Sequence, residues 1–224
     1  MTAFILQLDG KPFPHALGKI VCVGRNYAAH AAELNNPVPS EPLLFIKPAS
    51  AAAHFSEPVQ LPSGRGSVHH ELEMAVLIGA PLRAVDAASA QQAIAGIGLA
   101  LDLTLREVQD KLKRDAHPWE RSKAFDGAYP VSQFIGADGL DLHNLTLQLW
   151  RAGHLQQSGN TRDMLFAVSA LIAEISHNFS LQPGDIVSTG TPAGVGPLQS
   201  GESLIATLGQ HTADDLLRVE ARVA

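Results

Sequence analysis

Cysteine, aromatic residues and charged residues are all scarce in this chain of 224 residues. One cysteine, Cys22, excludes an intramolecular disulfide framework. Because it stands in the apolar run KIVCVG, we interpret it as a buried thiol rather than a nucleophile. Such cysteine usage fits a reducing cytoplasm. The net charge of −6 provides no basic surface for nucleic acid or anionic lipid. Neither nucleic acid nor a membrane is therefore an expected partner.

Long apolar runs, repeats and linkers are missing as well, and we expect no signal sequence. No run approaches the roughly 18 apolar residues of a membrane-spanning helix, and the start MTAFILQLDG lacks a basic flank before a long apolar core. With 46% hydrophobic and 17% charged residues, the composition is that of a folded enzyme. We expect a single catalytic domain over residues 1–224, located in the cytoplasm.

Short apolar segments bounded by glycine and proline dominate the chain and predict strands. They are residues 4–8, 20–24, 43–47, 71–79, 96–103, 145–150, 185–190, 203–208 and 216–223. Helical periodicity predicts helices over residues 27–34, 86–95, 105–114 and 162–177, the last with Thr161 as its N-cap. The strands do not alternate regularly with helices, which disfavours a doubly wound or βα-barrel fold. The expected class is α+β, a β-rich assembly of mixed sheets with a few peripheral helices.

Two acids, Glu71 and Glu73, stand inside one of the expected strands, in the stretch SVHHELEMAVLIG. Side chains at i and i+2 of a strand point to the same face, so the two carboxylates share one pocket. Their repulsion requires protonation, basic side chains or a metal ion, and Asp102 follows another apolar strand. Three carboxylates suggest Mg²⁺ or Mn²⁺, which prefer oxygen ligands. The adjacent His69 and His70 leave a zinc site as one alternative. The other alternative is that the acids face solvent on an edge strand and bind no metal.

A histidine and a glutamate, His30 and Glu33, are three residues apart in GRNYAAHAAELNNPVP and share one face if this segment is helical. A carboxylate beside an imidazole can fix its tautomer and raise its basicity, which produces a general base for water. The alternative is a surface helix on which the two side chains are merely neighbours. Gly24 and the residues NNPVP flank the segment, which is compatible with a mobile flap.

Three further features carry weaker signals. Lys123 is either a solvated loop lysine or a cation that stabilises an enolate or a carboxylate. Gln109, on the helix after Asp102, is by default a solvated amide. Residues 188–202 have the glycines of a tight ligand loop, but no helical pattern follows them. Nucleotide binding is therefore disfavoured, and exposed amides there can instead hold a substrate carboxylate.

Six segments spread over nearly the whole chain occur in a familiar order. They are GRNYAAHAAE, FIKP, HHELEMAVLIG, ALDLTLRE, WERSKAFDG and GDIVSTGTPAGVG. Together they resemble the fumarylacetoacetate hydrolase family, and most closely its small single-domain branch of acylpyruvases, oxaloacetate decarboxylases and fumarylpyruvate hydrolases. The resemblance implies a mixed β-sheet roll, usually a homodimer, with Mg²⁺ or Mn²⁺ held by Glu71, Glu73 and Asp102.

The resemblance also implies roles for the other candidate residues. His30 and Glu33 would form a water-activating dyad on a lid, Lys123 would polarise the substrate, and Thr191 would lie in the loop that binds its carboxylate. Arg25, Lys47 and Gln109 match family positions that lie near the same substrate pocket.

The expected activity is Mg-dependent cleavage of a C–C bond in acylpyruvates, 2,4-diketo acids such as acetylpyruvate or fumarylpyruvate, to pyruvate and a carboxylic acid. Such a substrate chelates the metal through its carboxylate and 2-oxo group, which makes the metal an electron sink. Oxaloacetate decarboxylation can use the same site. The alternatives are an isomerase, tautomerase or decarboxylase of 2-hydroxy-dienoates or 2-oxo diacids in aromatic catabolism, and a metal-binding interaction protein without catalysis.

Overall fold

The computed structural model describes residues 4–210 and 215–224, and strands make up most of its regular structure. The helices are α1 (Ala28–Glu33), α2 (Ala87–Gln92), α3 (Arg106–Arg114), α4 (Glu120–Lys123) and α5 (Val168–Asn178), with 3-10 turns at Ala49–Ala51 and Thr161–Asp163. The strands are β1 (Gln7–Leu8), β2 (Lys11–Pro12), β3 (Ile20–Gly24), β4 (Leu43–Lys47), β5 (Ala52–His54), β6 (Val68–His70), β7 (Leu72–Ile78), β8 (Ile94–Leu101), β9 (Thr104–Leu105), β10 (Tyr129–Val131), β11 (Ile135–Gly136), β12 (Thr146–Arg151), β13 (His154–Asn160), β14 (Ile186–Ser188), β15 (Gly196–Pro197), β16 (Ser203–Gly209) and β17 (Asp215–Arg222).

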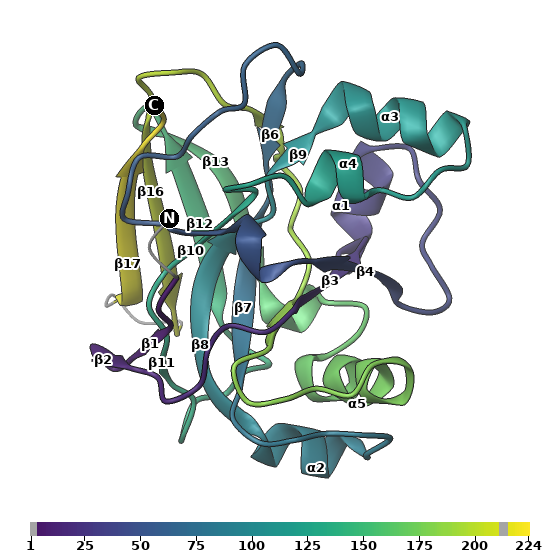
Figure 1. Cartoon of the computed structure of the whole chain (residues 1–224), viewed down its shortest axis with the longest axis vertical. Helices are drawn as coiled ribbons and strands as arrows, with labels where there is room; N and C mark the ends of the chain where they lie inside the picture. The colour runs from purple at the N-terminus through teal and green to yellow at the C-terminus, as the bar shows by residue number, and fades with distance from the viewer. Residues whose placement is uncertain (1–3, 211–214) are drawn as a thin grey trace.

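The strands form one large mixed sheet and three smaller sheets. The large sheet has the order β4-β3-β14-β7-β8-β10-β5, with β11 also paired to β8. The pairs β3–β14 and β5–β10 are parallel, and the other pairs in this sheet are antiparallel. A four-stranded antiparallel sheet, β13-β12-β16-β17, packs beside β7 and β8. The expected α+β class with mixed sheets is confirmed, and Figure 1 shows the sheets curled into a half-barrel.

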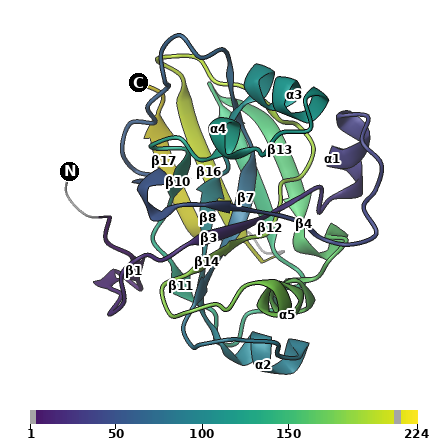
Figure 2. The ribbon, with the colours of Figure 1, turned by 45° about the vertical axis from the view of Figure 1, so that its right-hand side comes forward.

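The centre of the molecule lies at β7 and β8. Every residue of β7 is buried, and only Ala95 of β8 is not. Both strands consist almost entirely of apolar residues, as expected for strands covered on both faces. In Figures 1 and 2, α2 and α5 lie together at one end of the sheets, and α1, α3 and α4 lie at the other end. That second group surrounds the end of the sheet where the candidate acids lie.

The last predicted helix begins later than its sequence pattern indicates. Thr161 is not its N-cap, because α5 starts at Val168 after a short 3-10 turn capped by Asn160. The backbone between the turn and α5 is hydrogen-bonded to Asn26. The carbonyl of Asn26 accepts from Leu165 N at 2.8 Å, and its side chain accepts from Phe166 N at 2.8 Å. These long-range bonds satisfy backbone amides that would otherwise bond within a helix, so residues 164–167 are not helical.

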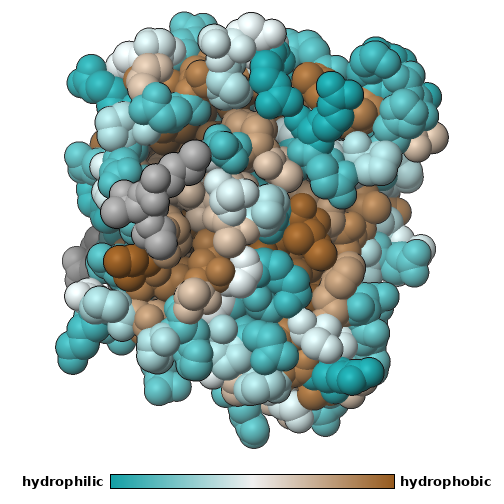
Figure 3. Space-filling view, in the orientation of Figure 1, coloured by the Kyte–Doolittle hydropathy of each residue, from teal (hydrophilic) through white to brown (hydrophobic). Residues whose placement is uncertain are grey.

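Apolar patches are interrupted by polar side chains on the face shown in Figure 3. In the described part of the chain, the large apolar residues that are exposed are Ile5, Val38, Leu155 and Leu165. Over the same residues, no helix is long and apolar enough to cross a membrane.

Candidate metal centre and its cavity

The three candidate metal-binding acids meet at one end of the β7–β8 pair. Glu73 lies in β7, Asp102 follows β8, and Glu71 falls in the break between β6 and β7 rather than inside a strand as the sequence predicted. The ladder nevertheless continues past the strands, since Asp102 N donates to Glu71 O at 2.9 Å. Ligand oxygens of the three carboxylates lie within 4.8 Å of one another, and none of the residues is more than 5% exposed.

Basic side chains from α3 and α4 neutralise two of these acids. Lys123 Nζ lies 2.9 Å from Glu71 Oε2 and 2.5 Å from Asp102 Oδ2, and Arg106 pairs with Glu71 Oε1. Burial alone would raise the pKa of Glu71, but the charges of Lys123 and Arg106 outweigh it and hold this pKa well below its usual value. Burial would likewise lower the pKa of Lys123, and the two carboxylates raise it instead. Lys123 is therefore a buried, permanently charged lysine and not a solvated one.

The third acid, Glu73, has polar contacts but no basic partner within ion-pair distance in the described structure. Its Oε2 accepts from Ser188 Oγ at 2.5 Å and from Gly190 N at 2.9 Å. Burial and the neighbouring charge of Asp102 raise the pKa of Glu73 to about 8. A buried carboxylate in this situation needs either a proton or a further cation.

The donor set fits a hard divalent cation at this position. Among the residues that the structure describes, these carboxylates form the one cluster of potential ligands, and His69 and His70 stand outside it. An all-oxygen set suits Mg²⁺ or Mn²⁺ and disfavours the zinc alternative. Glu73, which has no basic partner in the described structure, is the acid whose charge a bound cation would stabilise.

Lys47, which the family resemblance placed near the substrate, lies beneath the acids. Its Nζ is 2.8 Å from Asp102 Oδ1 and also donates to the backbone carbonyls of Leu103, Lys123 and Ala128. The residue has no exposed surface and is absent from the residues that line the cavity. With its donors engaged in this way, Lys47 is placed to hold Asp102 rather than to contact a substrate.

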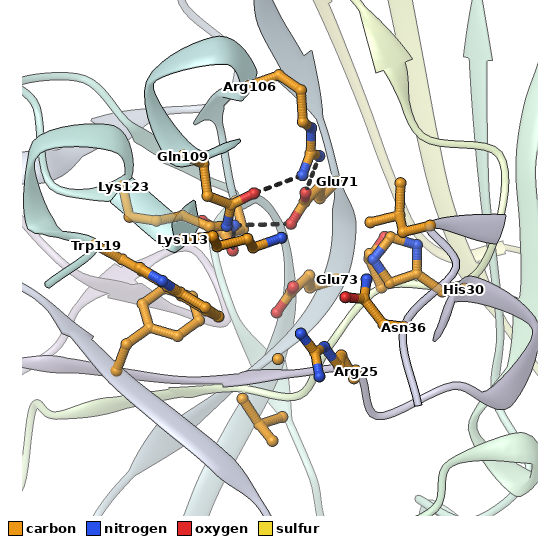
Figure 4. A pocket seen from close by; sticks show the side chains of 16 residues that line it. Arg25, His30, Asn36, Glu71, Glu73, Arg106, Gln109, Lys113, Trp119 and Lys123 are labelled. Carbon is orange, nitrogen blue, oxygen red and sulfur yellow. Dashed lines mark hydrogen bonds and ion pairs between the residues drawn. The ribbon is translucent and has the colours of Figure 1, made fainter. Parts of the chain in front are cut away.

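His30 and Glu33 come together on α1, as their spacing predicts. His30 Nδ1 lies 3.2 Å from Glu33 Oε2, and Glu33 Oε1 accepts from Gly194 N at 3.0 Å. Glu33 thus ties α1 to the loop that follows β14. His30 is 5% exposed and lines the same cavity as the three acids. Figure 4 shows its ring facing that cavity from the side opposite Lys123.

The cavity collects most of the residues that the sequence singled out. Arg25, Gln109 and Thr191 line it together with the acids, His30 and Lys123. Gln109 is 3% exposed and accepts from Arg106 Nη1 at 2.7 Å, so it is not the solvated amide of the default interpretation. Thr191 is 2% exposed.

Sequence reasoning missed several residues that line this cavity. Arg106, Gln109 and Lys113 project from one face of α3 because they are spaced at i, i+3 and i+7. Gln109 was already a candidate, and the residues one helical turn before and after it on the same face are Arg106 and Lys113. Checking those two positions would have identified both basic residues. Trp119 precedes α4, and its ring lies 5.6 Å from Lys113 Nζ. Asn36 lies beyond α1, and no local pattern identifies it.

Two glycine amides within residues 188–202 hold protein carboxylates of the site in this structure. Gly190 N donates to Glu73, and Gly194 N donates to Glu33. Both glycines have left-handed backbones, with φ of 90° and 100°, and an added Cβ would lie 2.7 Å from Asn26 Cβ or 2.0 Å from Gln156 O. Glycine is therefore required at each position where the loop reaches an acid.

Gln157 in β13 fixes the orientation of Thr191. Its Oε1 accepts from Leu72 N at 2.9 Å and lies 3.0 Å from His70 Nδ1, which must therefore carry a proton. Burial lowers the pKa of His70 to about 4, so its ring is neutral. Gln157 Nε2 donates to Thr191 Oγ1 at 2.7 Å and to Pro192 O at 2.9 Å. The hydroxyl hydrogen of Thr191 consequently points away from Gln157.

A curled mixed sheet with three buried carboxylates and a histidine–glutamate pair around one cavity defines the class to which this protein belongs. Residues 19–223 match the family model for the fumarylacetoacetate (FAA) hydrolase C-terminal domain, and the chain belongs to the fumarylacetoacetate hydrolase family. The resemblance recognised in the sequence is thereby confirmed.

Individual relatives are similar over almost the whole chain. Oxaloacetate tautomerase YcgM of Escherichia coli is 50% identical over 206 residues, which cover 91% of this chain and 94% of the relative. The structure of a candidate fumarylacetoacetate isomerase/hydrolase from Oleispira antarctica has a TM-score of 0.95 and 53% identity, covering 98% of this chain and 99% of that one. Fumarylpyruvate hydrolase from Pseudomonas aeruginosa, in complex with Mn²⁺ and pyruvate, has a TM-score of 0.90 and 29% identity, covering 100% and 97%.

Proposed function

We propose that this protein is a divalent-metal-dependent enzyme that interconverts the keto and enol forms of oxaloacetate and also decarboxylates it. The observation that carries this proposal is the placement of the acid triad and the His30–Glu33 pair around a single cavity. The similarity to an oxaloacetate tautomerase along 91% of the chain supports the choice of substrate.

Each side chain around the cavity has a chemical task in this proposal. Glu71, Glu73 and Asp102 would hold Mg²⁺ or Mn²⁺, which when bound polarises the carboxylate and 2-oxo group of a 2-oxo acid. His30 would carry the proton between C3 and the 2-oxo oxygen, because imidazole exchanges protons near neutral pH. Glu33 would fix the tautomer and direction of the ring through the bond to Nδ1.

The remaining residues would bind and orient the substrate. Lys123, whose raised pKa keeps it charged, is suited to stabilise negative charge on the 2-oxo oxygen and unsuited to act as a base. Thr191 and Gln109 would donate hydrogen bonds from the cavity wall, and Arg25 would add a positive charge. Lys47 would act indirectly, by holding Asp102.

Hydrolysis of acylpyruvates is the second candidate, and the His30–Glu33 pair is the observation that favours it. The same imidazole can take a proton from water, which then attacks the distal carbonyl of acetylpyruvate or fumarylpyruvate and releases pyruvate and a carboxylic acid. The pair also counts against a metal-binding protein without catalysis. The relative that is a fumarylpyruvate hydrolase supports this activity less strongly, since it is 29% identical.

The two candidate activities are separated by a substrate panel assayed with Mg²⁺ and with a chelator. Oxaloacetate tautomerisation is followed through the ultraviolet absorbance of the enol, decarboxylation through CO₂ release, and acetylpyruvate or fumarylpyruvate cleavage through pyruvate. We expect metal-dependent loss of enol to be the fastest reaction. Faster cleavage of an acylpyruvate would make hydrolysis the main function, and no metal-dependent reaction on any of these substrates would refute both.

Replacing His30 tests the proton transfer itself. His30→Ala should lower tautomerisation by about 10²–10⁴-fold, a typical contribution of a general base. Decarboxylation breaks a C–C bond and needs no base to remove a proton from C3, so its rate should fall less. The matched control is His177→Ala, an exposed histidine on α5. Full retention of tautomerisation in His30→Ala would remove the pair from the mechanism.

Three other expectations remain proposals. We propose that residues 1–224 act as a single catalytic domain, that the protein is cytoplasmic, and that two chains form a homodimer. Sedimentation of the purified protein tests the last of these.

A further inference from the structure

Two cations of the cavity lack an acidic partner at ion-pair distance in the described structure. Arg106 and Lys123 are paired with the metal-site acids, but Lys113 and Arg25 form no such ion pair. Figure 4 shows the Lys113 ammonium group and the Arg25 guanidinium group pointing into the cavity from opposite walls. Lys113 comes from α3, and Arg25 follows the end of β3.

Lys113 is held at this place without being neutralised. Its side chain is half-buried, and its Nζ lies 5.6 Å from the centre of the Trp119 ring, which orients the ammonium group but supplies no negative charge. Burial, and then repulsion by Arg106 and Arg25, lowers the pKa of Lys113 even though Asp110 and Glu71 attract it from a greater distance. An anion bound beside Lys113 would relieve this repulsion.

Arg25 has a second unusual property, a left-handed backbone with φ of 61°. Non-glycine residues adopt this conformation at an energetic cost, and they keep it where the surrounding structure imposes it, often at functional sites. The conformation places a guanidinium group, which suits carboxylates, at the edge of a cavity that already contains Lys113.

Lys113 also lies between two hollows. It lines the cavity of the metal-site acids and a neighbouring pocket that has Glu33, Asp110 and Arg106 in its walls. A 2-oxo acid whose first carboxylate and 2-oxo group bind at the acids would have its far end in the same cavity. A negative charge there would find Lys113 and Arg25 as the lining cations without an ion-pair partner in the described structure.

We propose that Lys113 and Arg25 form an anion subsite that binds the distal carboxylate of a dicarboxylic 2-oxo acid. This inference rests on the proposed function, because it assumes that the acid triad receives the 2-oxo acid end. It assigns the preference for a diacid to two residues that contact the end of the substrate that tautomerisation leaves unchanged. Lys113 and Arg25 then determine which 2-oxo acids bind well, and His30 and Lys123 act on all of them.

Two substrates of the same shape isolate the contribution of the distal charge. Acetylpyruvate carries a methyl group where oxaloacetate carries its distal carboxylate oxygen, so the pair differs in charge at one atom position. Lys113→Met keeps the length of the side chain and removes its charge. The ratio of kcat/KM for oxaloacetate tautomerisation, which leaves the distal carboxylate intact, to kcat/KM for acetylpyruvate cleavage should fall about 10- to 100-fold, the usual value of a hydrogen bond between charged groups.

The matched control is Lys111→Met on the same helix. Lys111 is exposed, pairs with Asp115 and does not line the cavity, so its loss should leave the ratio unchanged. Arg25→Asn should also lower the ratio, because asparagine tolerates the left-handed backbone and lacks the charge. A ratio that changes by less than about threefold in both Lys113→Met and Arg25→Asn would overturn the subsite.

A binding measurement keeps the test independent of turnover. Malate carries a 2-hydroxy acid and a distal carboxylate, and lactate lacks only the distal group. Calorimetry on the Mg²⁺-loaded wild-type protein should show tighter binding of malate, and Lys113→Met should remove most of the difference. Equal affinities in the wild type would overturn the subsite. If malate is preferred but neither substrate is turned over, the proposed function fails and the subsite stands.

Discussion

Glu73→Gln should make the metal-free protein more stable near neutral pH while it weakens metal binding. Glu73 is 1% exposed, and its contacts with Ser188 and Gly190 supply hydrogen bonds but no positive charge. A glutamine can direct its carbonyl oxygen to both donors, so the substitution preserves these bonds and removes the charge. The effect on stability therefore reports the cost of burying the carboxylate alone.

The size of the effect follows from the raised pKa of Glu73, which is about 8 in the folded protein against an ordinary value of 4.5. Between these two values the folded protein retains a proton that the unfolded chain has lost, so unfolding releases a proton. The free energy of unfolding then falls as pH rises through this window and is constant on either side. At pH 7 the accumulated loss is about 3 kcal/mol relative to a protein without this group.

Urea denaturation in the presence of a chelator measures this difference. Unfolding of wild type and Glu73→Gln would be followed by tryptophan fluorescence from pH 4 to 9, and subtraction of the two curves cancels the other titrating groups. The difference should grow from pH 5 to 8 in favour of the variant. Mg²⁺ at 100 times its Kd should restore about 2.7 kcal/mol to the wild type and much less to the variant. A difference that is flat, or that favours the wild type as pH rises, would refute the reasoning.

Two further substitutions test contacts around the same cavity. Lys123→Met should lower turnover of oxaloacetate and acetylpyruvate, while calorimetry shows equal or tighter Mg²⁺ binding, because Glu71 and Asp102 lose a competing cation; weaker Mg²⁺ binding would contradict this. Gln157→Leu leaves buried donors unpaired and frees the Thr191 hydroxyl, so urea denaturation should show a loss of about 1–3 kcal/mol and KM should rise more than kcat falls. An unchanged KM would separate Gln157 from substrate binding.

Local patterns in the sequence were sufficient for the fold class and for the main candidate residues. Apolar segments of strand length predicted most of the long strands, and the i, i+2 spacing brought Glu71 and Glu73 to one pocket even though Glu71 lies outside β7. The i, i+3 spacing of His30 and Glu33 placed their side chains in contact. Both pairs were placed correctly because the local direction of the backbone sets where side chains two or three residues apart point.

Boundaries that depend on distant segments were predicted less well. The helical pattern over residues 162–177 is continuous, yet α5 begins at Val168 because Asn26 binds the preceding backbone from a distance of 140 positions in the chain. The glycine-rich loop after β14 looked suited to a substrate carboxylate, and two of its amides hold Glu73 and Glu33 instead. Neither partner can be identified from neighbouring residues.

The sequence by itself determined that this chain is a β-rich protein of the fumarylacetoacetate hydrolase family with three acids suited to a divalent cation. Only the tertiary structure decided how charge is distributed among them. Lys123 and Arg106 neutralise Glu71, Lys47 is buried under Asp102, and Glu73 is left without a basic partner. The residue type of a lysine does not reveal whether its side chain is solvated or buried against a carboxylate. Its environment is set by elements that meet only when the sheets curl and the helices close over their end.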